Sequence, residues 1–317
     1  MGGLHGEFMQ NLINVFPDVL RIETVGKCNF ECIHCPTGTK PNNRGLLSVN
    51  NFHFIVEQLT TNGIIPRVVV LYHAGEPLLN KKLPYFIREL KKIGVENTVI
   101  TTNASLLDEK RSIELIEAGL DEIEVSFDGQ NASENNYIRE KGDFYHDAEN
   151  LRVFCKLRKE LGKSNPKITV SNVQICTKET LESNRNGSVR PISNVPEYLT
   201  EFFNDELDEI EFKSFPAMVW PGYEKLGYYD VIYYDEAKPK YCTSLFETTT
   251  ILSNGNVVMC CYDLPGELVL GNVFKNTILE IWNSIKCSTI RDNFRKQQYG
   301  TVCEKCNVVS PRYLCKK

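Results

Sequence analysis

Twelve cysteines are the most unusual feature of this 317-residue sequence. Three lie between positions 28 and 35 and seven lie beyond position 240, while two stand alone at 155 and 176. The N-terminus lacks the basic and apolar pattern of a signal peptide, and in a chain that is not exported clustered cysteines indicate metal binding rather than disulfides. The distribution therefore predicts two metal sites in two domains.

The first cysteine group has the spacing CxxxCxxC and is made by Cys28, Cys32 and Cys35. Three thiolates can hold a [4Fe–4S] cluster while leaving one iron open to a small chelating molecule. A zinc ion bound by the same thiolates and His34 is an alternative, because zinc prefers four nitrogen or sulfur ligands. Three unrelated thiols in a loop are the other alternative.

The second group surrounds a predicted hairpin, whose turn is Asn254-Gly255. Four of its thiols could ligate a second cluster, or a Cys₄ zinc site of the same spacing: Cys242, Cys260, Cys303 and Cys306. Cys261 and Cys315 could replace or supplement these ligands. We expect Cys155 and Cys287 to be packing residues in helices.

Short apolar runs alternate with amphipathic ones along the first two thirds of the chain, which predicts strands interleaved with helices. The predicted strands are 19–25, 67–72, 98–102, 123–127, 168–176 and 209–215. This α/β pattern indicates a parallel sheet closed into a partial (β/α)6 barrel, with its active site in the loops after the strands. The expected division is an N-terminal extension (1–18), the barrel (19–215), a linker (216–240) and a small β-hairpin and helix domain (241–317).

The composition is that of an ordinary globular enzyme, with 42% hydrophobic and 24% charged residues. The net charge of −5 gives no reason to expect nucleic acid as a partner. No apolar run approaches the ~18 residues of a membrane span, so no membrane association is expected. Together with the missing signal peptide, this predicts a cytoplasmic location.

The chain resembles the radical S-adenosylmethionine (SAM) superfamily, whose signature is CxxxCxΦC with an aromatic residue usually at Φ. His34 takes that place, and the family's Gly-Gly-Glu-Pro motif is found here as Ala74-Gly75-Glu76-Pro77, with Ala for the first Gly. Ser126-Phe127-Asp128-Gly129 ends the fourth strand as a further family element. The resemblance implies that Cys28, Cys32 and Cys35 bind the [4Fe–4S] cluster, and that the SAM contacts are His34, Gly75, Glu76, Asn103, Ser126 and Arg139.

The C-terminal part resembles the SPASM/Twitch extension of these enzymes. The matching elements are the hairpin leading to Cys260-Cys261, then Gly271-Asn272, then Ile281-Trp282 on a helix. A full SPASM pattern uses seven cysteines for two auxiliary clusters, and this chain lacks the complete cysteine run in its tail. The resemblance therefore implies the shorter Twitch arrangement, with one auxiliary [4Fe–4S] cluster on Cys242, Cys260, Cys303 and Cys306, a second cluster being less expected.

The resemblance also implies the reaction type. Reductive cleavage of SAM yields a 5′-deoxyadenosyl radical that abstracts hydrogen from a substrate, with a flavodoxin or ferredoxin-type protein as electron donor. Because only 18 residues precede the first strand, we expect no leader-peptide domain and therefore a small polar substrate: a sugar, an aminocyclitol or a nucleoside-linked sugar. Oxidation of an alcohol is the expected outcome. The alternatives are a peptide-modifying maturase or epimerase, and a zinc-binding module without enzymatic activity.

Strand alternation adds one expectation about the substrate. Asn172, Gln174 and Cys176 share one face of the fifth strand, and we expect that face to line the cavity beside SAM rather than to meet solvent. Cys176 would then be placed to return a hydrogen atom to a substrate radical, which would favour epimerisation over oxidation.

Overall fold

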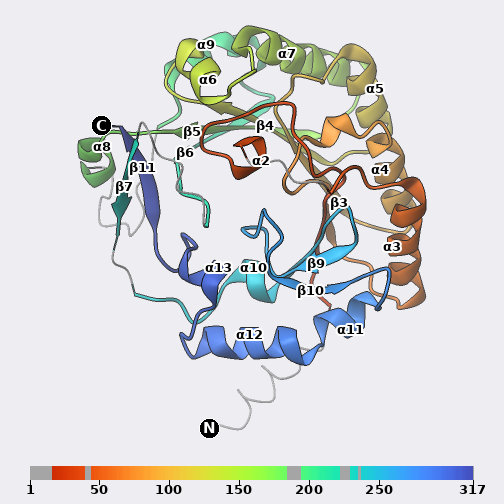
Figure 1. Cartoon of the computed structure of the whole chain (residues 1–317). Coiled ribbons are helices and arrows are strands. Elements are labelled where there is room, and N and C mark those ends of the chain that lie inside the picture. Colours follow the sequence, from red (N-terminus) through yellow and green to blue (C-terminus); the bar gives the residue numbers. More distant parts are fainter. Residues whose placement is uncertain (1–15, 40–43, 184–193, 222–228, 235–236, 317) are drawn as a thin grey trace, which may run out of the picture.

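The computed structural model describes residues 16–39, 44–183, 194–221, 229–234 and 237–316. Its main element is a nine-stranded sheet that curves around the centre of the molecule, with helices on the outside (Figure 1). The strand order is β10-β9-β8-β1-β2-β3-β4-β5-β6. The strands are β1 (Val19–Ile22), β2 (Val68–Val70), β3 (Asn97–Thr102), β4 (Glu122–Asp128), β5 (Lys167–Gln174), β6 (Ile210–Pro216), β8 (Thr248–Ile251), β9 (Asn256–Val258) and β10 (Val269–Asn272).

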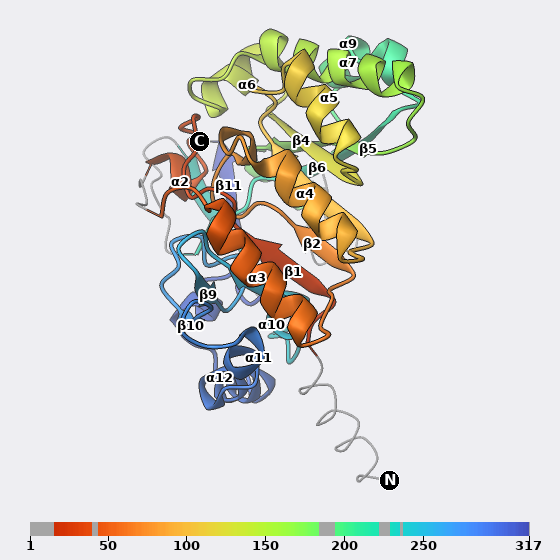
Figure 2. The same ribbon diagram turned by 90° about the vertical axis from the view of Figure 1, so that its right-hand side faces the viewer.

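Strands β1 to β6 pair in parallel in chain order, and the six-stranded partial barrel is confirmed. The outer helices are α3 (Val49–Thr61), α4 (Leu83–Lys92), α5 (Glu109–Glu117), α6 (Ala132–Ile138), α7 (Phe144–Glu160) and α9 (Glu197–Phe202). Short helical turns are α2 (Pro36–Thr39), η1 (Pro77–Leu79), α8 (Lys178–Ser183) and η2 (Asn204–Glu206). Figure 2 shows α3 and α4 lying along the outside of β1 and β2.

The predicted C-terminal hairpin forms, and it joins the barrel sheet directly. β8 pairs in parallel with β1 over the whole length of β1, from Val19 opposite Thr248 to Ile22 opposite Ile251. β9 and β10 continue the sheet in antiparallel fashion. The C-terminal helices α10 (Thr243–Phe246), α11 (Ile278–Trp282), α12 (Ile285–Arg295) and α13 (Thr301–Glu304) gather below this edge (Figures 1 and 2). The barrel and the C-terminal region thus share one continuous sheet.

The stretch predicted as a linker contains a strand. β7 (Tyr229–Tyr233) pairs in antiparallel fashion with β11 (Arg312–Lys316), forming a separate two-stranded sheet. The predicted N-terminal extension lies mostly outside the described residues, which begin at Phe16.

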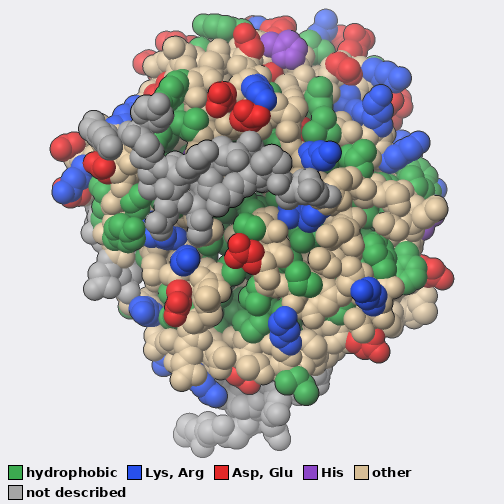
Figure 3. Space-filling view, viewed as in Figure 1, with side chains coloured by type: hydrophobic (Ala, Val, Ile, Leu, Met, Phe, Trp, Pro, Cys, Tyr) green, Lys and Arg blue, Asp and Glu red, His purple; other side chains and the backbone are tan. Residues whose placement is uncertain are grey.

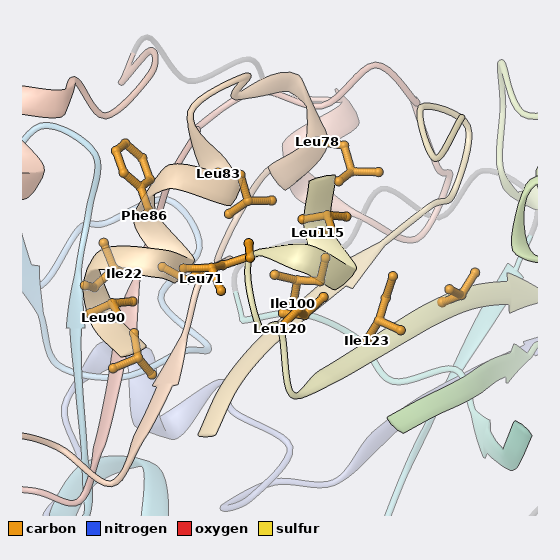
Figure 4. Packing of buried hydrophobic residues seen from close by; sticks show 14 of the residues in the cluster. Ile22, Leu71, Leu78, Leu83, Phe86, Leu90, Ile100, Leu115, Leu120 and Ile123 are labelled. Atoms are coloured by element: carbon orange, nitrogen blue, oxygen red, sulfur yellow. The ribbon is translucent and has the colours of Figure 1, made fainter. Parts of the chain in front are cut away.

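The sheet has an apolar outer face and a polar inner face. Fully buried outer residues such as Ile22, Ile100 and Ile123 pack against the helices in the main hydrophobic core (Figure 4). Parallel register pairs Thr101 with Glu124, and Ser126 with Ser171, on the opposite face. Because side chains alternate along a strand, the inner face collects the polar residues that face the centre of the barrel.

The surface carries both signs of charge, and Lys and Arg side chains gather over α4 and α5 at the upper right of Figure 3. Among the described residues, none of the helices is both long enough and apolar enough to cross a bilayer.

Candidate active site and auxiliary centre

The loop after β1 carries Cys28, Cys32 and Cys35 and is held against the end of α6. The backbone N–H of Glu31 donates to the Glu140 carbonyl, and that of Ile33 donates to the Ile138 carbonyl, both at 3.0 Å. The Phe30 N–H points to the sulfur of Cys28 at 3.4 Å. The two bonds to Glu140 and Ile138 therefore fix the loop through its backbone.

The electrostatic surroundings of the thiols suit a cationic cluster. Burial is the main cause that raises the pKa of Cys28 to about 11 and that of Cys32 to about 12; neighbouring thiols contribute to the rise, and Arg139 opposes it. Clustered thiolates at such a site need a compensating positive charge, which cluster iron supplies when it binds. The donor set therefore fits a [4Fe–4S] cluster with three protein ligands.

The turn of Ala74-Gly75-Glu76-Pro77 is pressed against the backbone just before Cys28. A Cβ on Gly75 would lie 2.2 Å from the Val25 carbonyl oxygen and 2.5 Å from that of Lys27, so only glycine fits. The Glu76 N–H donates to the same Lys27 oxygen at 2.8 Å. This packing explains the Gly at position 75, while its contact with SAM stays a prediction.

Glu76 is fully enclosed, and its carboxylate is used inside the protein. It accepts hydrogen bonds from Thr102 Oγ1 at 2.7 Å, the Asn103 N–H at 2.8 Å and the Leu78 N–H at 3.0 Å. Burial raises its pKa, and these donors oppose that rise. Glu76 therefore holds the end of β3 in place, a positioning role that the sequence did not reveal.

Asn103 follows β3 and reaches the cysteine loop. Its Nδ2 donates to Asn29 Oδ1 at 3.0 Å and lies 4.0 Å from the Cys28 sulfur. The motif after β2, the end of β3 and the cysteine loop thus meet at one point.

Asp128, at the end of β4, links two predicted SAM contacts. Arg139 Nη1 donates to Asp128 Oδ2 at 2.9 Å, and His34 Nε2 lies 3.9 Å from the same oxygen. Burial and Arg139 lower the pKa of His34, which Asp128 opposes, so the ring is neutral near pH 7. His34 Nδ1 is buried without a partner and is free to face a ligand. Ser126 lies half-buried on the inner face, two residues before Asp128.

The expectation for Asn172, Gln174 and Cys176 is wrong. Asn172 pairs in register with Phe127 of the outer face, so its side chain lies on the opposite side from Ser126. The Asn172 amide donates to the Phe127 and Gly129 carbonyls and accepts from Gln174, so protein groups satisfy this polar face.

Cys176 itself is buried in a small apolar cluster with Leu181, Tyr234, Tyr313 and Cys315. Ile175 is the neighbour that packs toward Ile33 of the cysteine loop. The backbones of Cys176 and Cys315 form a β-bridge. The proposed hydrogen-donor role of Cys176 therefore loses its geometric basis, because its thiol faces away from the inner side of the barrel.

The four thiols predicted for the auxiliary centre line one apolar pocket: Cys242, Cys260, Cys303 and Cys306. Cys261 is absent from the pocket lining, and its sulfur lies 3.5 Å from Ser244 Oγ. Burial raises the pKa of all four lining thiols above its ordinary value. Cys315 lies with Cys176 instead. Cys155 and Cys287 are buried in α7 and α12, as expected.

Two ion-paired residues that the sequence did not single out join the two centres. Arg44, at the end of the cysteine loop, pairs with the buried Glu23 and also donates to the carbonyls of Leu264 and Pro265. Ser253 donates to Glu23 through its N–H and its hydroxyl. These residues are far apart in the sequence, so no local pattern could have identified them.

In the described part of the chain, no three His, Cys, Asp or Glu residues converge closely enough for one metal ion.

The fold and these two cysteine sites define an iron–sulfur protein, and the chain belongs to the radical SAM superfamily. Residues 22–183 match the family described as "Radical SAM superfamily", and residues 242–307 match SPASM, described as "Iron-sulfur cluster-binding domain". The protein therefore uses a [4Fe–4S] cluster and SAM together with auxiliary iron–sulfur chemistry. The alternative of a zinc-binding module without activity does not hold.

The matches to curated relatives cover less than half of this chain. The chain is 33% identical over 122 residues to the probable GTP 3′,8-cyclase of Methanothermobacter thermautotrophicus, covering 38% of this chain and 39% of that protein. It is 33% identical over 140 residues to the GTP 3′,8-cyclase of Petrotoga mobilis, covering 43% and 42%. The chain thus spans about two fifths of the length of the curated relatives that it matches.

Solved structures share the whole fold at low identity. BtrN in complex with AdoMet and 2-DOIA matches with a TM-score of 0.60 and 17% identity, covering 92% of this chain and 93% of that one. Streptococcus suis SuiB bound to precursor peptide SuiA matches with a TM-score of 0.59 and 18% identity, covering 90% and 70%.

Proposed function

We propose that this protein abstracts a hydrogen atom from a small polar substrate held inside the barrel and oxidises an alcohol to a ketone. The main support for a polar substrate is the polar inner face of the sheet. There Thr101, Glu124 and Ser171 face the barrel interior next to the predicted SAM contacts. Thr101 Oγ1 is buried there without a partner. A polar ligand would satisfy such a group, whereas an apolar one would leave it unpaired.

The auxiliary centre supports oxidation in particular. After hydrogen abstraction, the substrate radical becomes a ketone by losing its hydroxyl proton to water and one electron, which a cluster on Cys242, Cys260, Cys303 and Cys306 would accept. The continuous sheet and the Arg44 contacts hold this region firmly against the barrel. Cys176, the thiol that favoured epimerisation, faces the other way. One auxiliary cluster is proposed, because the pocket holds four thiols.

The likeness to BtrN, crystallised with AdoMet and 2-DOIA, is compatible with a small substrate. A peptide substrate is the second candidate, since SuiB with its precursor peptide has a comparable fold. Both likenesses are below 20% identity and therefore concern the fold alone.

The test is anaerobic incubation of the reconstituted protein with SAM, dithionite and candidate substrates, followed by mass spectrometry. We expect 5′-deoxyadenosine and a substrate that has lost the mass of two hydrogens. Unchanged substrate mass with deuterium uptake from solvent would establish epimerisation instead. The variant with Cys28, Cys32 and Cys35 changed to Ala should form no 5′-deoxyadenosine, whereas Cys287→Ala should retain it.

We also propose that a basic groove beside the cysteine loop receives an acidic flavodoxin or ferredoxin-type donor. Lys81, Lys82 and Arg88 line this groove, and none of them has an ion-pair partner in the described chain; its acidic lining residue, Glu114, already pairs with Arg111. Asn80, next to Lys81, donates to the carbonyls of Thr24 and Leu47, which flank the cysteine loop. Asn80 therefore links the groove to the two ends of the cysteine loop.

Charge reversal tests this docking site. Lys81→Glu combined with Lys82→Glu should slow reduction by flavodoxin, more strongly at low salt, because complementary charge accelerates encounter. Reduction by dithionite should be unchanged, and Lys110→Glu on the neighbouring α5 serves as the matched control. Equal flavodoxin rates in the double variant and the control would disprove the site.

A further inference from the structure

Arg21 on β1 is a cation on the inner face of the barrel without an acidic partner. Its half-buried guanidinium lies 4.8 Å above the ring of Tyr72, and Nη1 donates to the Tyr72 carbonyl at 3.3 Å. Its Nε is buried and has no hydrogen-bond partner. Arg21 forms no ion pair within the described chain, and the nearby Glu23 is already neutralised by Arg44.

Two further polar side chains beside Arg21 each have a polar atom without a hydrogen-bond partner. Thr250 pairs in register with Arg21 on the adjacent β8, is fully buried, and its Oγ1 makes no hydrogen bond. His73 follows Tyr72, is 8% exposed, and its Nδ1 makes no hydrogen bond.

The orientation of His73 defines what its free nitrogen can bind. Nε2 lies 3.3 Å from the Asp263 carbonyl oxygen, which can only accept, so Nε2 carries the proton. Burial lowers the pKa of His73 to about 4, so the ring is neutral and Nδ1 is an acceptor. Nδ1 therefore suits a ligand hydroxyl.

Unpaired polar groups in a protein interior cost free energy, and a cluster of them on one wall indicates a missing ligand. We propose that Arg21, Thr250 and His73 form a substrate subsite that binds an anionic group, phosphate or carboxylate, next to a hydroxyl. The inference rests on the proposed function and narrows it. It favours a sugar phosphate, a nucleoside-linked sugar or a sugar acid, and it disfavours a cationic aminocyclitol, which Arg21 would repel.

Matched sugars test the charge preference. Binding of glucose, glucosamine, glucose 1-phosphate and glucuronate is measured by anaerobic titration calorimetry on SAM-loaded holoenzyme. We expect the two anionic sugars to bind at least roughly tenfold more tightly than glucose, and glucosamine to bind most weakly. Comparison of glucose 1-phosphate with glucuronate distinguishes phosphate from carboxylate. If neither anion binds more tightly than glucose, the inference is wrong.

Variants then assign the effect to this subsite. Arg21→Met, which keeps an unbranched apolar stem but removes the charge, should abolish the preference for anions, and Arg21→Lys should retain part of it. Thr250→Val, which has nearly the same shape, should weaken binding several-fold. Lys213→Ala is the control, because Lys213 is an exposed cation on β6 that pairs with Glu211. Iron content and SAM affinity report on folding.

The outcomes separate this inference from the proposed function. Unchanged anion binding in Arg21→Met disproves the subsite, as does a loss of SAM affinity in that variant, which would place Arg21 in the SAM site. A preference for anions that is lost in Arg21→Met would support the subsite. If the same protein forms no 5′-deoxyadenosine with any substrate, the proposed reaction is disproved while the subsite stands.

Discussion

The guanidinium of Arg44 donates to both carboxylate oxygens of Glu23, at 2.8 Å from Nε and 2.7 Å from Nη2. The Glu23 side chain is fully buried, at the end of the strand that leads into the cysteine loop. Burial alone would raise the pKa of Glu23, but Arg44 and the other donors hold it below its ordinary value. The ion pair fixes the Arg44 guanidinium, which also donates to the carbonyls of Leu264 and Pro265. Arg44 therefore connects the cysteine loop to the loop that carries these two residues.

We expect Arg44→Met to lower the free energy of unfolding by about 3–5 kcal/mol, because it leaves the Glu23 carboxylate buried without its partner. In the wild type, the stabilisation is present above the unfolded pKa of Glu23 and is lost as the pH falls through the lower folded value. The free energies of unfolding of variant and wild type should thus differ more at pH 7 than at pH 4. Urea unfolding of the anaerobic holoenzyme at both pH values measures this difference.

The double variant Arg44→Met with Glu23→Gln is the control for charge burial. It removes the unpaired carboxylate and should recover part of the lost stability. If it is as unstable as Arg44→Met alone, the loss comes from the contacts of Arg44 with Leu264 and Pro265.

Gly75→Ala should disrupt SAM binding. The new methyl group would collide with the Val25 and Lys27 carbonyls, so the turn must move away from the cysteine loop. We expect at least roughly tenfold weaker SAM binding, measured by anaerobic equilibrium dialysis. Gly300→Ala is the matched control, because its added Cβ meets no atom within 4 Å and should leave SAM affinity unchanged.

Adjacent cysteines allow a direct test of the auxiliary ligands. Cys260→Ser should lose about four irons per chain, because Cys260 lines the auxiliary pocket. Cys261→Ser should keep full iron content, since Cys261 is not part of that lining. Iron and sulfide analysis after anaerobic reconstitution gives the answer. The reverse result would exchange the assignments of the two residues.

His73 predicts a specific loss of stability in acid. Its folded pKa is about 4 and its unfolded value about 6.5, so the unfolded chain binds more protons between these values. The contribution of His73 to the free energy of unfolding is therefore fully present above pH 6.5. It declines as the pH falls toward 4, by about 3 kcal/mol at most. His73→Asn should flatten this part of the stability profile. Parallel profiles for variant and wild type between pH 7 and pH 5 would show that His73 does not titrate as described.

The barrel could be predicted from the sequence because each βα unit has its own local signal. The apolar outer residues of β3 and β4, Ile100 and Ile123, and the turn signals between the strands are visible without long-range information. The ligand spacing of Cys28, Cys32 and Cys35 is likewise local. The pairing of β8 with β1 could not be predicted, because it joins residues more than 200 positions apart that share no motif.

The orientation of β5 shows a second limit. Its sequence has polar side chains on both faces, and Asn172 and Gln174 lie on the outer face, where Gln174 and Ser214 satisfy the Asn172 amide. Alternation reveals that two faces exist, and only the register with β4 decides which face is inside. The register that places Arg21 beside Thr250 was hidden for the same reason.

The pairing of β1 with β8 also has a consequence for biosynthesis. β1 is translated first, and its edge toward β8 has no partner until the ribosome has produced more than 200 further residues. During that interval the nascent chain exposes an unpaired strand edge, which is prone to association with other chains. The sheet can therefore be completed only after Cys28, Cys32 and Cys35 have been made, and Cys303 and Cys306 follow its last strand in the chain. We infer that the auxiliary cluster assembles after the strands of the sheet have been made and that truncation before β8 yields an aggregating barrel.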